Sequence, residues 1–290
     1  MREAIREHLE LLQDYSGAFD PDAVTPETAK PYFVIAQRPE EEDSPWAGFR
    51  RNFEVWVNLD HTNFDALDDA EAQVKSHLGG ELLETAAGAK FTPVYLGGIG
   101  DDSVLEDFRV ITRGLLFAVL AVQPIPQEEA APQDSWVSAL AEFTDALLNP
   151  ISDPPPDPLP DPLWSIYTGR WPQGYKRPAL LWRLEGAPAI EDTTAQTYEI
   201  TKTLVCHVLG ATPNGQDGAT LLIADKLASA IKVPLDLGER RYLTVQSVST
   251  RTVTDPFKEG QLTITLSRRQ ARGHQATELM GVAKVEGDVT

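Results

Sequence analysis

Two stretches decide the fold: Pro31-Tyr32-Phe33-Val34-Ile35 and Pro178-Ala179-Leu180-Leu181-Trp182, which begin 147 residues apart. Each is a strand-like apolar pattern opened by proline, a residue that sheets accept at the first position of a strand. Similar offsets, of 145 and 147 residues, relate two more pairs of strand patterns: residues 53–57 with 198–202, and 115–117 with 262–264. Residue identity within the pairs is almost nil. The chain therefore predicts a repeat of pattern and order, with a unit too long for a solenoid.

Hydrophobic periodicity assigns each half two helices and four strands. In the first half the helices are expected near residues 5–12 and at 66–78, and the strands at 31–37, 53–59, 91–96 and 107–122. In the second half the helices are expected at 136–147 and 219–231, and the strands at 178–184, 196–209, 240–249 and 260–268. Each half is thus α-β-β-α-β-β.

Polar residues next to the helical patterns supply candidate caps. Asn63 or Asp65 can cap the helix at 66–78, and Asp134 or Ser135 the helix at 136–147. In the last helix the spacing predicts a buried stripe made of Leu221, Ala224, Leu227 and Ile231.

Two segments between the strands predict loops. Residues 38–48 hold two prolines and the acidic run Glu40, Glu41, Glu42 and Asp43. Residues 97–102 are rich in glycine and end on Asp101 and Asp102. We expect both segments to be exposed, either as solvated turns or as contacts for a partner.

The predicted fold class is α+β, with two tandem copies of an α-β-β-α-β-β domain. Long strands that are neighbours in sequence favour a largely antiparallel sheet with helices packed on one face. The expected domains are residues 1–125 and 135–269, joined by a linker at 126–134. Residues 270–290 lack a sustained apolar period and predict a C-terminal tail.

Charge is distributed unevenly between the halves. Residues 1–150 hold 28 acidic and 10 basic side chains, a net charge of −18, whereas residues 151–290 hold 16 and 15, a net charge of −1. Binding to nucleic-acid phosphates needs clustered Lys and Arg, so such binding is not expected. No apolar run reaches the roughly 18–20 residues of a membrane span, so no membrane partner is expected either.

Residue patterns typical of catalysis are scarce. Neither a G-x-S-x-G nor a P-loop motif occurs, and the five histidines are scattered. Cys206 lies in a strand pattern beside His207, and neighbours on a strand point to opposite faces, so Cys206 is predicted to be a core residue. Carboxylates at Asp68, Asp69 and Glu71, or at Asp101 and Asp102, could bind a divalent cation or simply form solvated surfaces. We expect no enzyme activity, cofactor or metal.

Aromatic residues gather after a proline-rich segment, at Trp164, Tyr167, Trp171 and Tyr175. Aromatics outside regular elements are enriched at interfaces, and they can equally fold back onto their own domain. Both interpretations stay open at this point.

The order of elements resembles that of the tail terminator, or tail completion, proteins of long-tailed bacteriophages. Their pattern is an N-terminal helix, a P-Y-x-V strand after a proline-rich loop, a long alternating strand, a helix with an alanine-rich stripe and a closing β-hairpin. Here the first half carries the resemblance in Pro31-Tyr32-Phe33-Val34 and residues 53–59, 66–78 and 109–119. The second half carries it in residues 178–182, 198–208, 219–231 and 262–266. It covers about 240 residues.

The resemblance implies a structural virion protein, made in the host cytoplasm and placed at the head-proximal end of the tail. Family members are usually single domains that form a hexameric ring on the tail tube. Two domains in one chain depart from this, so three chains could mimic six copies, or six chains could build a double layer. The implied partners are further copies of the chain, the tail tube protein, the head–tail connector and, in tails that have one, the sheath.

Genomic DNA would pass through such a ring without specific binding. Glu40, Glu41, Glu42, Asp43, Asp101 and Asp102 are then candidates for an electronegative lumen or a partner contact. The main rival within the virion is a head–tail connector or neck protein of the same module. The rival from another class is a small-molecule or metal-binding protein.

Overall fold

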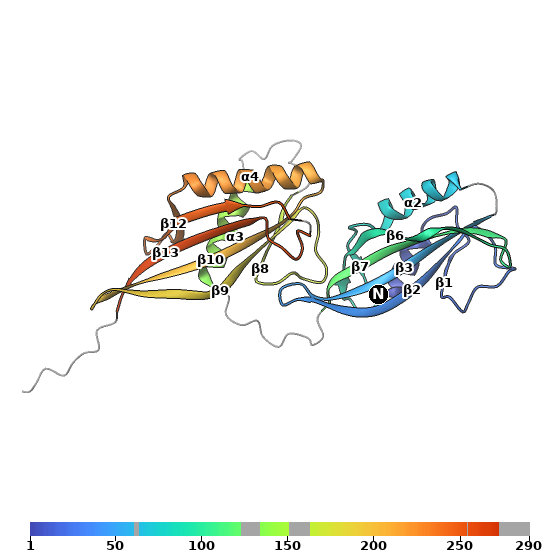
Figure 1. Cartoon of the computed structure of the whole chain (residues 1–290), viewed down its shortest axis with the longest axis horizontal. Helices are drawn as coiled ribbons and strands as arrows, with labels where there is room; N and C mark the ends of the chain where they lie inside the picture. The colour runs from blue at the N-terminus through green and yellow to red at the C-terminus, as the bar shows by residue number, and fades with distance from the viewer. Residues whose placement is uncertain (61–63, 123–133, 151–162, 254, 273–290) are drawn as a thin grey trace, which may run out of the picture.

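The computed structural model describes residues 1–60, 64–122, 134–150, 163–253 and 255–272. Figure 1 shows two sheets arranged one after the other along the long axis, each with its own helices. The first half contains α1 (Arg2–Leu9), β1 (Ala18–Phe19), β2 (Tyr32–Ser44), β3 (Gly48–Asp60), α2 (Asp65–Leu78), β4 (Leu83–Glu84), β5 (Lys90–Phe91), β6 (Pro93–Leu105) and β7 (Val110–Val122). The second half contains α3 (Ser135–Leu148), β8 (Ser165–Thr168), β9 (Ala179–Thr194), β10 (Thr197–Leu209), α4 (Pro213–Ser229), β11 (Lys232–Asp236), β12 (Arg241–Thr250) and β13 (Leu262–Ala271).

Strand order follows the same path in both sheets. The first sheet runs β1-β2-β3-β7-β6 and the second, taken from its other edge, β8-β9-β10-β13-β12-β11. In each sheet the short first strand pairs parallel to its neighbour, and the other pairs are antiparallel. The Lys30–Pro31 and Arg177–Pro178 peptide bonds, just before β2 and β9, are cis. The prediction of a mixed helix-and-strand chain with largely antiparallel sheets is confirmed.

Each half has a core between its helices and one face of its sheet. In the first half, Leu9 of α1 and Leu67 of α2 pack with Phe53, Val55 and Val57, the alternate residues of β3. In the second half α3 and α4 pack on Leu204, Cys206 and Val208 of β10. The period of two along each strand thus places one face under both helices of its half.

Cys206 is confirmed as a core residue. It is fully buried under the helices, and this burial raises the pKa of its thiol well above the ordinary value. His207 next to it points to the opposite face of the sheet, where it meets Trp46 and Trp171.

The acidic run is not a loop, contrary to expectation. β2 continues to Ser44, and Glu40 and Glu41 pair with Arg51 and Arg50 of β3. A register shift between Gln37 and Glu40 takes up Pro39, which a regular ladder would not accept. Opposite charges across the pair favour continued pairing, an effect that local composition does not show.

The glycine-rich segment is also a strand, contrary to expectation. β6 runs from Pro93 to Leu105 and includes residues 97–102. Gly97 and Gly100 have φ angles of +135° and +65°, and the register shifts between Ile99 and Ser103. The glycines therefore form a bulge that keeps β6 on β7, since glycine tolerates positive φ.

The predicted face of the last helix is wrong at two of its four positions. Leu221 and Ile231 are 62% and 70% exposed, whereas Leu227 is fully buried and Ala224 partly so. The buried side chains of α4 are Ala219, Thr220, Ile223 and Leu227. The helix begins with Pro213 after the Thr212 cap and ends at Ser229, so Ile231 lies beyond it.

The other helix ends give mixed outcomes. Asp134 caps α3 as expected, because its carboxylate accepts a hydrogen bond from the Trp136 N–H at 2.9 Å. Asp65 is the first residue of α2 and does not cap it, and Asn63 lies outside the described residues. At the other end of the chain, Gln270 pairs with Tyr198, so β13 extends beyond the predicted domain end at 269. Residues 123–133, 151–162 and 273–290, which include most of the predicted linker and tail, lie outside the described residues.

Candidate functional site

The tip of the β2–β3 hairpin reaches from the first half onto the second (Figure 1). At this tip the Trp46 indole N–H donates to the Lys258 carbonyl at 3.2 Å, and the Trp46 carbonyl accepts from the Trp171 N–H at 2.9 Å. The Arg183 guanidinium lies 3.7 Å from the centroid of the Trp46 ring, a cation–π contact. Ala47, next to Trp46, is fully buried. The hairpin tip is therefore anchored by Trp46, through one hydrogen bond from its indole ring, one hydrogen bond to its backbone carbonyl and the contact with Arg183.

His207 lies behind Trp46 on β10. The Arg183 Nε donates to His207 Nε2 at 2.9 Å, so the Nδ1–H of the neutral ring donates to the Pro256 carbonyl at 3.1 Å. Burial, together with the positive charge of Arg183, lowers the pKa of His207 to about 4. The junction thus holds a neutral imidazole whose two nitrogens both have partners.

Trp171 and Tyr175 form the other wall of the junction. Trp171 stacks on Phe257, with ring centroids 5.2 Å apart and planes at 14°. The Tyr175 backbone binds the first half, since its carbonyl accepts from Thr92 Oγ1 at 2.6 Å and its N–H donates to the same oxygen at 3.1 Å. Both aromatic residues are buried in one apolar cluster with Ala47, Ala118 and Leu120 of the first half.

The four predicted aromatic residues therefore lie in different parts of the structure. Trp171 and Tyr175 lie at the junction between the halves, and Tyr167, in β8, is partly buried against the same cluster. Trp164 packs into the core of the second half. The segment that holds the four aromatic residues contains β8, so the prediction of a wholly irregular segment is wrong. Trp46 and Arg183 also form the junction, and neither of them was predicted from the sequence. A tryptophan between Pro45 and Ala47 in an otherwise polar segment was the available signal.

The β9–β10 hairpin has the opposite character. It closes at Thr194 and Thr197, and Ile190 near its tip is 65% exposed. β8 covers the outer edge of β9 only as far as Trp182, so residues 185–194 have no second strand partner within the described chain. Figure 1 shows this hairpin projecting away from the rest of the molecule. We call residues 184–203 the arm.

Arg113 gathers the acidic residues that were considered as a cation site. Its guanidinium donates to Asp102 at 2.6 and 2.7 Å, to Asp68 at 2.6 Å and to Glu71 at 2.9 Å. Asp69 is exposed and outside this cluster. The space between these carboxylates is thus filled by a side-chain cation, and the described residues contain no group of three or more side chains placed to hold a metal.

Contacts within this cluster shift the pKa values of several of its side chains. Hydrogen bonds from Arg113 lower the pKa of Asp102 and raise that of Arg113 itself. The Tyr95 hydroxyl donates to Glu71 at 2.7 Å, which lowers the pKa of Glu71, while burial and this bond raise the pKa of Tyr95 to about 12. These shifts belong to a structural network that joins α2 to the sheet.

The candidate lumen residues are spread over the two long hairpins of the first half. Glu40 accepts a hydrogen bond from Arg51 Nε at 2.7 Å, and Glu41 and Asp101 are exposed. Asp102 is held by Arg113, and the side chains of Glu42 and Asp43 lie outside the described residues. Among the carboxylates of this set whose side chains are described, Glu41 and Asp101 are thus exposed and outside the Arg51 and Arg113 ion pairs.

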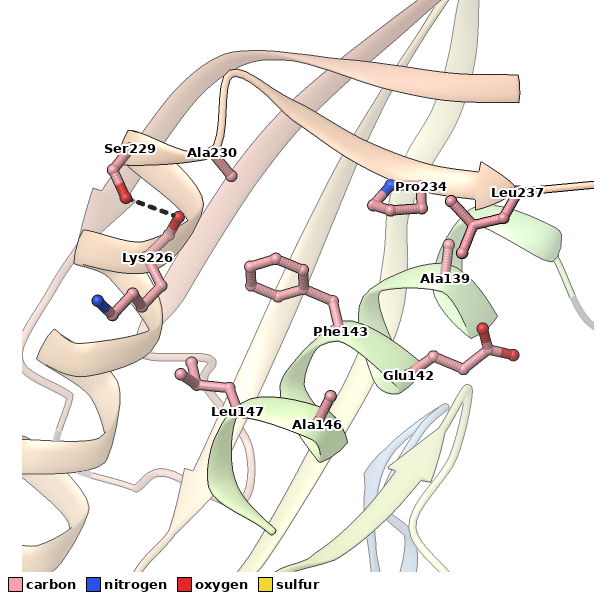
Figure 2. A pocket seen from close by; sticks show the side chains of 10 residues that line it. All are labelled: Ala139, Glu142, Phe143, Ala146, Leu147, Lys226, Ser229, Ala230, Pro234 and Leu237. Carbon is pink, nitrogen blue, oxygen red and sulfur yellow. Dashed lines mark hydrogen bonds between the residues drawn. The ribbon is translucent and has the colours of Figure 1, made fainter. Parts of the chain in front are cut away.

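A shallow apolar groove lies between α3, α4 and β11, with a volume of about 630 Å³. Figure 2 shows Phe143 and Leu147 of α3 facing Lys226 of α4 and Ala230 directly after it, with Pro234 and Leu237 closing one end. Glu142 and Lys226 are its only charged lining residues. The groove lacks the convergent polar groups of a typical small-molecule site.

Comparison with known proteins gives no match, since neither a protein-family model nor a curated protein sequence corresponds to this chain. Among the described helices, none is long and apolar enough to cross a membrane.

Proposed function

We propose that the chain is a structural subunit of a bacteriophage tail, in which its two halves are tandem copies of one domain. Several copies would assemble into a ring at the head-proximal end of the tail, end the growth of the tail tube and join the tail to the head connector. The observation that carries the proposal is the shared strand order of the two sheets, joined by a hairpin of one half lying on the other. A contact of this head-to-tail type can repeat from chain to chain and close into a ring.

The charge of the first half supports a channel. Like charges on adjacent subunits repel each other, by up to about 1 kcal/mol for a pair 4 Å apart in water and less in salt. Residues 1–122 hold 23 acidic and 10 basic side chains, a net charge of −13, and residues 123–150 account for the rest of the −18. The charge of the first half would therefore lie on open surfaces such as a lumen, with Glu41 and Asp101 facing the DNA. An electronegative wall would let DNA pass without adhering to it.

Electron microscopy of the purified protein tests the ring. We expect closed particles with a central channel, built from three or six chains, and a lumen that is electronegative once an assembled structure is solved. Isolated monomers at micromolar concentration would contradict the proposed assembly, and a basic lumen would contradict the DNA channel.

Tail tube protein from the same genome tests the terminator role. Added to polymerising tubes, the protein is expected to bind one end and stop growth. A head–tail connector or neck protein of the same module would form rings too, but it would leave tube length unchanged and bind the portal end of the head. Rings with that behaviour would replace the terminator role by the connector role.

A further inference from the structure

We propose that the arm of one chain docks on the first half of a second copy, in the way that the β2–β3 hairpin docks on the second half within one chain. The inference rests on the proposed function, because it names the contact through which the ring would form. Its occupant is a second copy of this chain.

The two hairpins hold matching places in their sheets. β2 and β3 lie between β1 and β7, and β9 and β10 lie between β8 and β13. Val55 of β3 pairs with Leu115, and Cys206 of β10 pairs with Leu262, so Trp56 and His207 occupy the same position one residue further along. The surface that receives a hairpin tip around His207 therefore has a counterpart around Trp56.

That counterpart is an apolar row across the first sheet, on the face opposite to the helices. Val34 pairs with Trp56, Trp56 with Gly114, and Gly114 with Ile99. A Cβ at Gly114 would come within 3.0 Å of both the Trp56 ring and Ile99, so these two side chains close over Gly114. Val34, Trp56 and Ile99 are each partly exposed, whereas His207 at the matching place is covered by Trp46 and Trp171.

The arm has the features of a segment that needs a partner. Residues 185–196 are all exposed, and beyond Trp182 no described strand pairs with the outer edge of β9, an edge of the kind that proteins ordinarily cover or protect. Ile190 offers an apolar anchor near the tip. Glu185, Glu191, Asp192 and Glu199 outnumber Lys202 in the arm, while Arg268 and Arg269 lie on β13 beside it. Apolar contact at Ile190, and not charge, would therefore hold the arm on the acidic first half.

Ile190→Asp in the full chain tests the arm, with sedimentation velocity as the readout of assembly. The variant is expected to raise the concentration of half-assembly by about tenfold or more, because a charge would replace an apolar anchor. Its melting temperature should stay that of the parent chain, since Ile190 is exposed. Leu221→Asp is the matched control, equally exposed but on α4, and it should assemble like the parent chain.

A photo-reactive benzophenone amino acid in place of Ile190 then locates the docking surface. Mixed with isotope-labelled parent chains, it is expected to cross-link to β3 or β6 of a labelled chain, near Trp56 or Ile99. The same group in place of Leu221 should give no such product. Ile190→Asp chains that still form rings, or cross-links confined to other regions, overturn the arm contact and leave the ring intact. Parent chains that remain monomeric overturn the proposed function, and a cross-link near Trp56 would then still support the arm contact.

Discussion

The β2–β3 and β9–β10 hairpins hold the same place in two sheets of the same strand order, yet their tips have opposite surroundings. Ala47 at the first tip is fully buried against the second half, whereas Ile190 near the second tip is 65% exposed. The first tip carries Trp46 and meets Arg183 and His207 of the other half. The second carries small and polar residues, and its described contacts are with the end of its own sheet, where the Arg272 N–H donates to the Gln196 carbonyl at 2.8 Å and the Arg272 side chain pairs with Asp192. Strand order therefore sets where a hairpin lies, and the residues at its tip decide what it binds.

Removing the aromatic wall of the junction should have the largest effect on this comparison. Trp171→Ala is expected to destabilise the chain by about 3–5 kcal/mol, because a buried ring stacked on Phe257 is lost and a cavity remains. Ile190→Ala, at the exposed tip, should change stability by less than about 0.5 kcal/mol. Urea unfolding of both variants gives the two values. Equal effects would mean that the two tips do not differ as described.

The second largest effect on stability is expected in the helix–sheet core of the second half. Leu140→Ala and Leu227→Ala should each cost roughly 2–5 kcal/mol, since both side chains are fully buried between helix and sheet. Leu221→Ala, on the exposed face of α4, serves as the control and should cost less than about 0.5 kcal/mol. Thermal and chemical unfolding measure all three. A cost below about 1 kcal/mol for Leu227 would show that the buried face of α4 is assigned wrongly.

Low pH should destabilise the junction between the two halves, because His207 becomes protonated. Its pKa of about 4 in the folded chain is below the ordinary value of 6.5, so the folded state binds fewer protons than the unfolded state in this interval. Neutral His207 therefore contributes up to about 3 kcal/mol to the free energy of unfolding. This contribution is fully present above pH 6.5 and is lost as the pH falls to about 4. Carboxylates titrate in the same range, so the measured quantity is the difference in unfolding free energy between the parent chain and His207→Gln. A difference that stays constant from pH 7 to pH 4 would contradict the assignment.

The smallest effect is expected at the Arg113 cluster on the first half. Dialysis against a chelator should leave the thermal transition unchanged, because the Arg113 guanidinium binds the carboxylates of Asp68, Glu71 and Asp102. Arg113→Met should cost about 1 kcal/mol, the order of a partly exposed ion-pair network. Differential scanning calorimetry with and without chelator makes the comparison. A clear drop with chelator alone would restore the metal site.

Local sequence pattern was sufficient to predict features that depend on residues within one helix or strand. The alternation in β3 placed Val55 and Val57 in the core, the strand pattern around Cys206 placed its thiol there too, and Asp134 caps α3. Each of these depends on neighbours within a few residues. Local pattern failed at residues 40–43 and 97–102, where strand pairing with β3 and β7 outweighs proline, glycine and acidic composition.

The candidate site was only half visible in the sequence. Trp171 and Tyr175 stood out because aromatics are uncommon in irregular segments, but nothing in the chain indicated that Trp46, 125 residues earlier, would lie against the same cluster. Arg183 lies near the end of the strand predicted at 178–184, and its contacts to Trp46 and His207 involve two other segments of the chain.

By itself the sequence determined the period of each strand and the main apolar faces, because these depend on residue spacing along the chain. The predicted match of residues 53–57 with 198–202 is wrong, because Phe33 pairs with Val57 and Leu180 pairs with Val208, which places β3 and β10 at an offset of 151 residues and not 145. Only the tertiary structure decided which hairpin tip is covered, which acidic residues are neutralised by Arg51 and Arg113, and where the two halves meet. The physical reason is that burial, backbone pairing and ion pairing between distant segments form only when the chain has folded, and their free energy depends on partners that no local window contains.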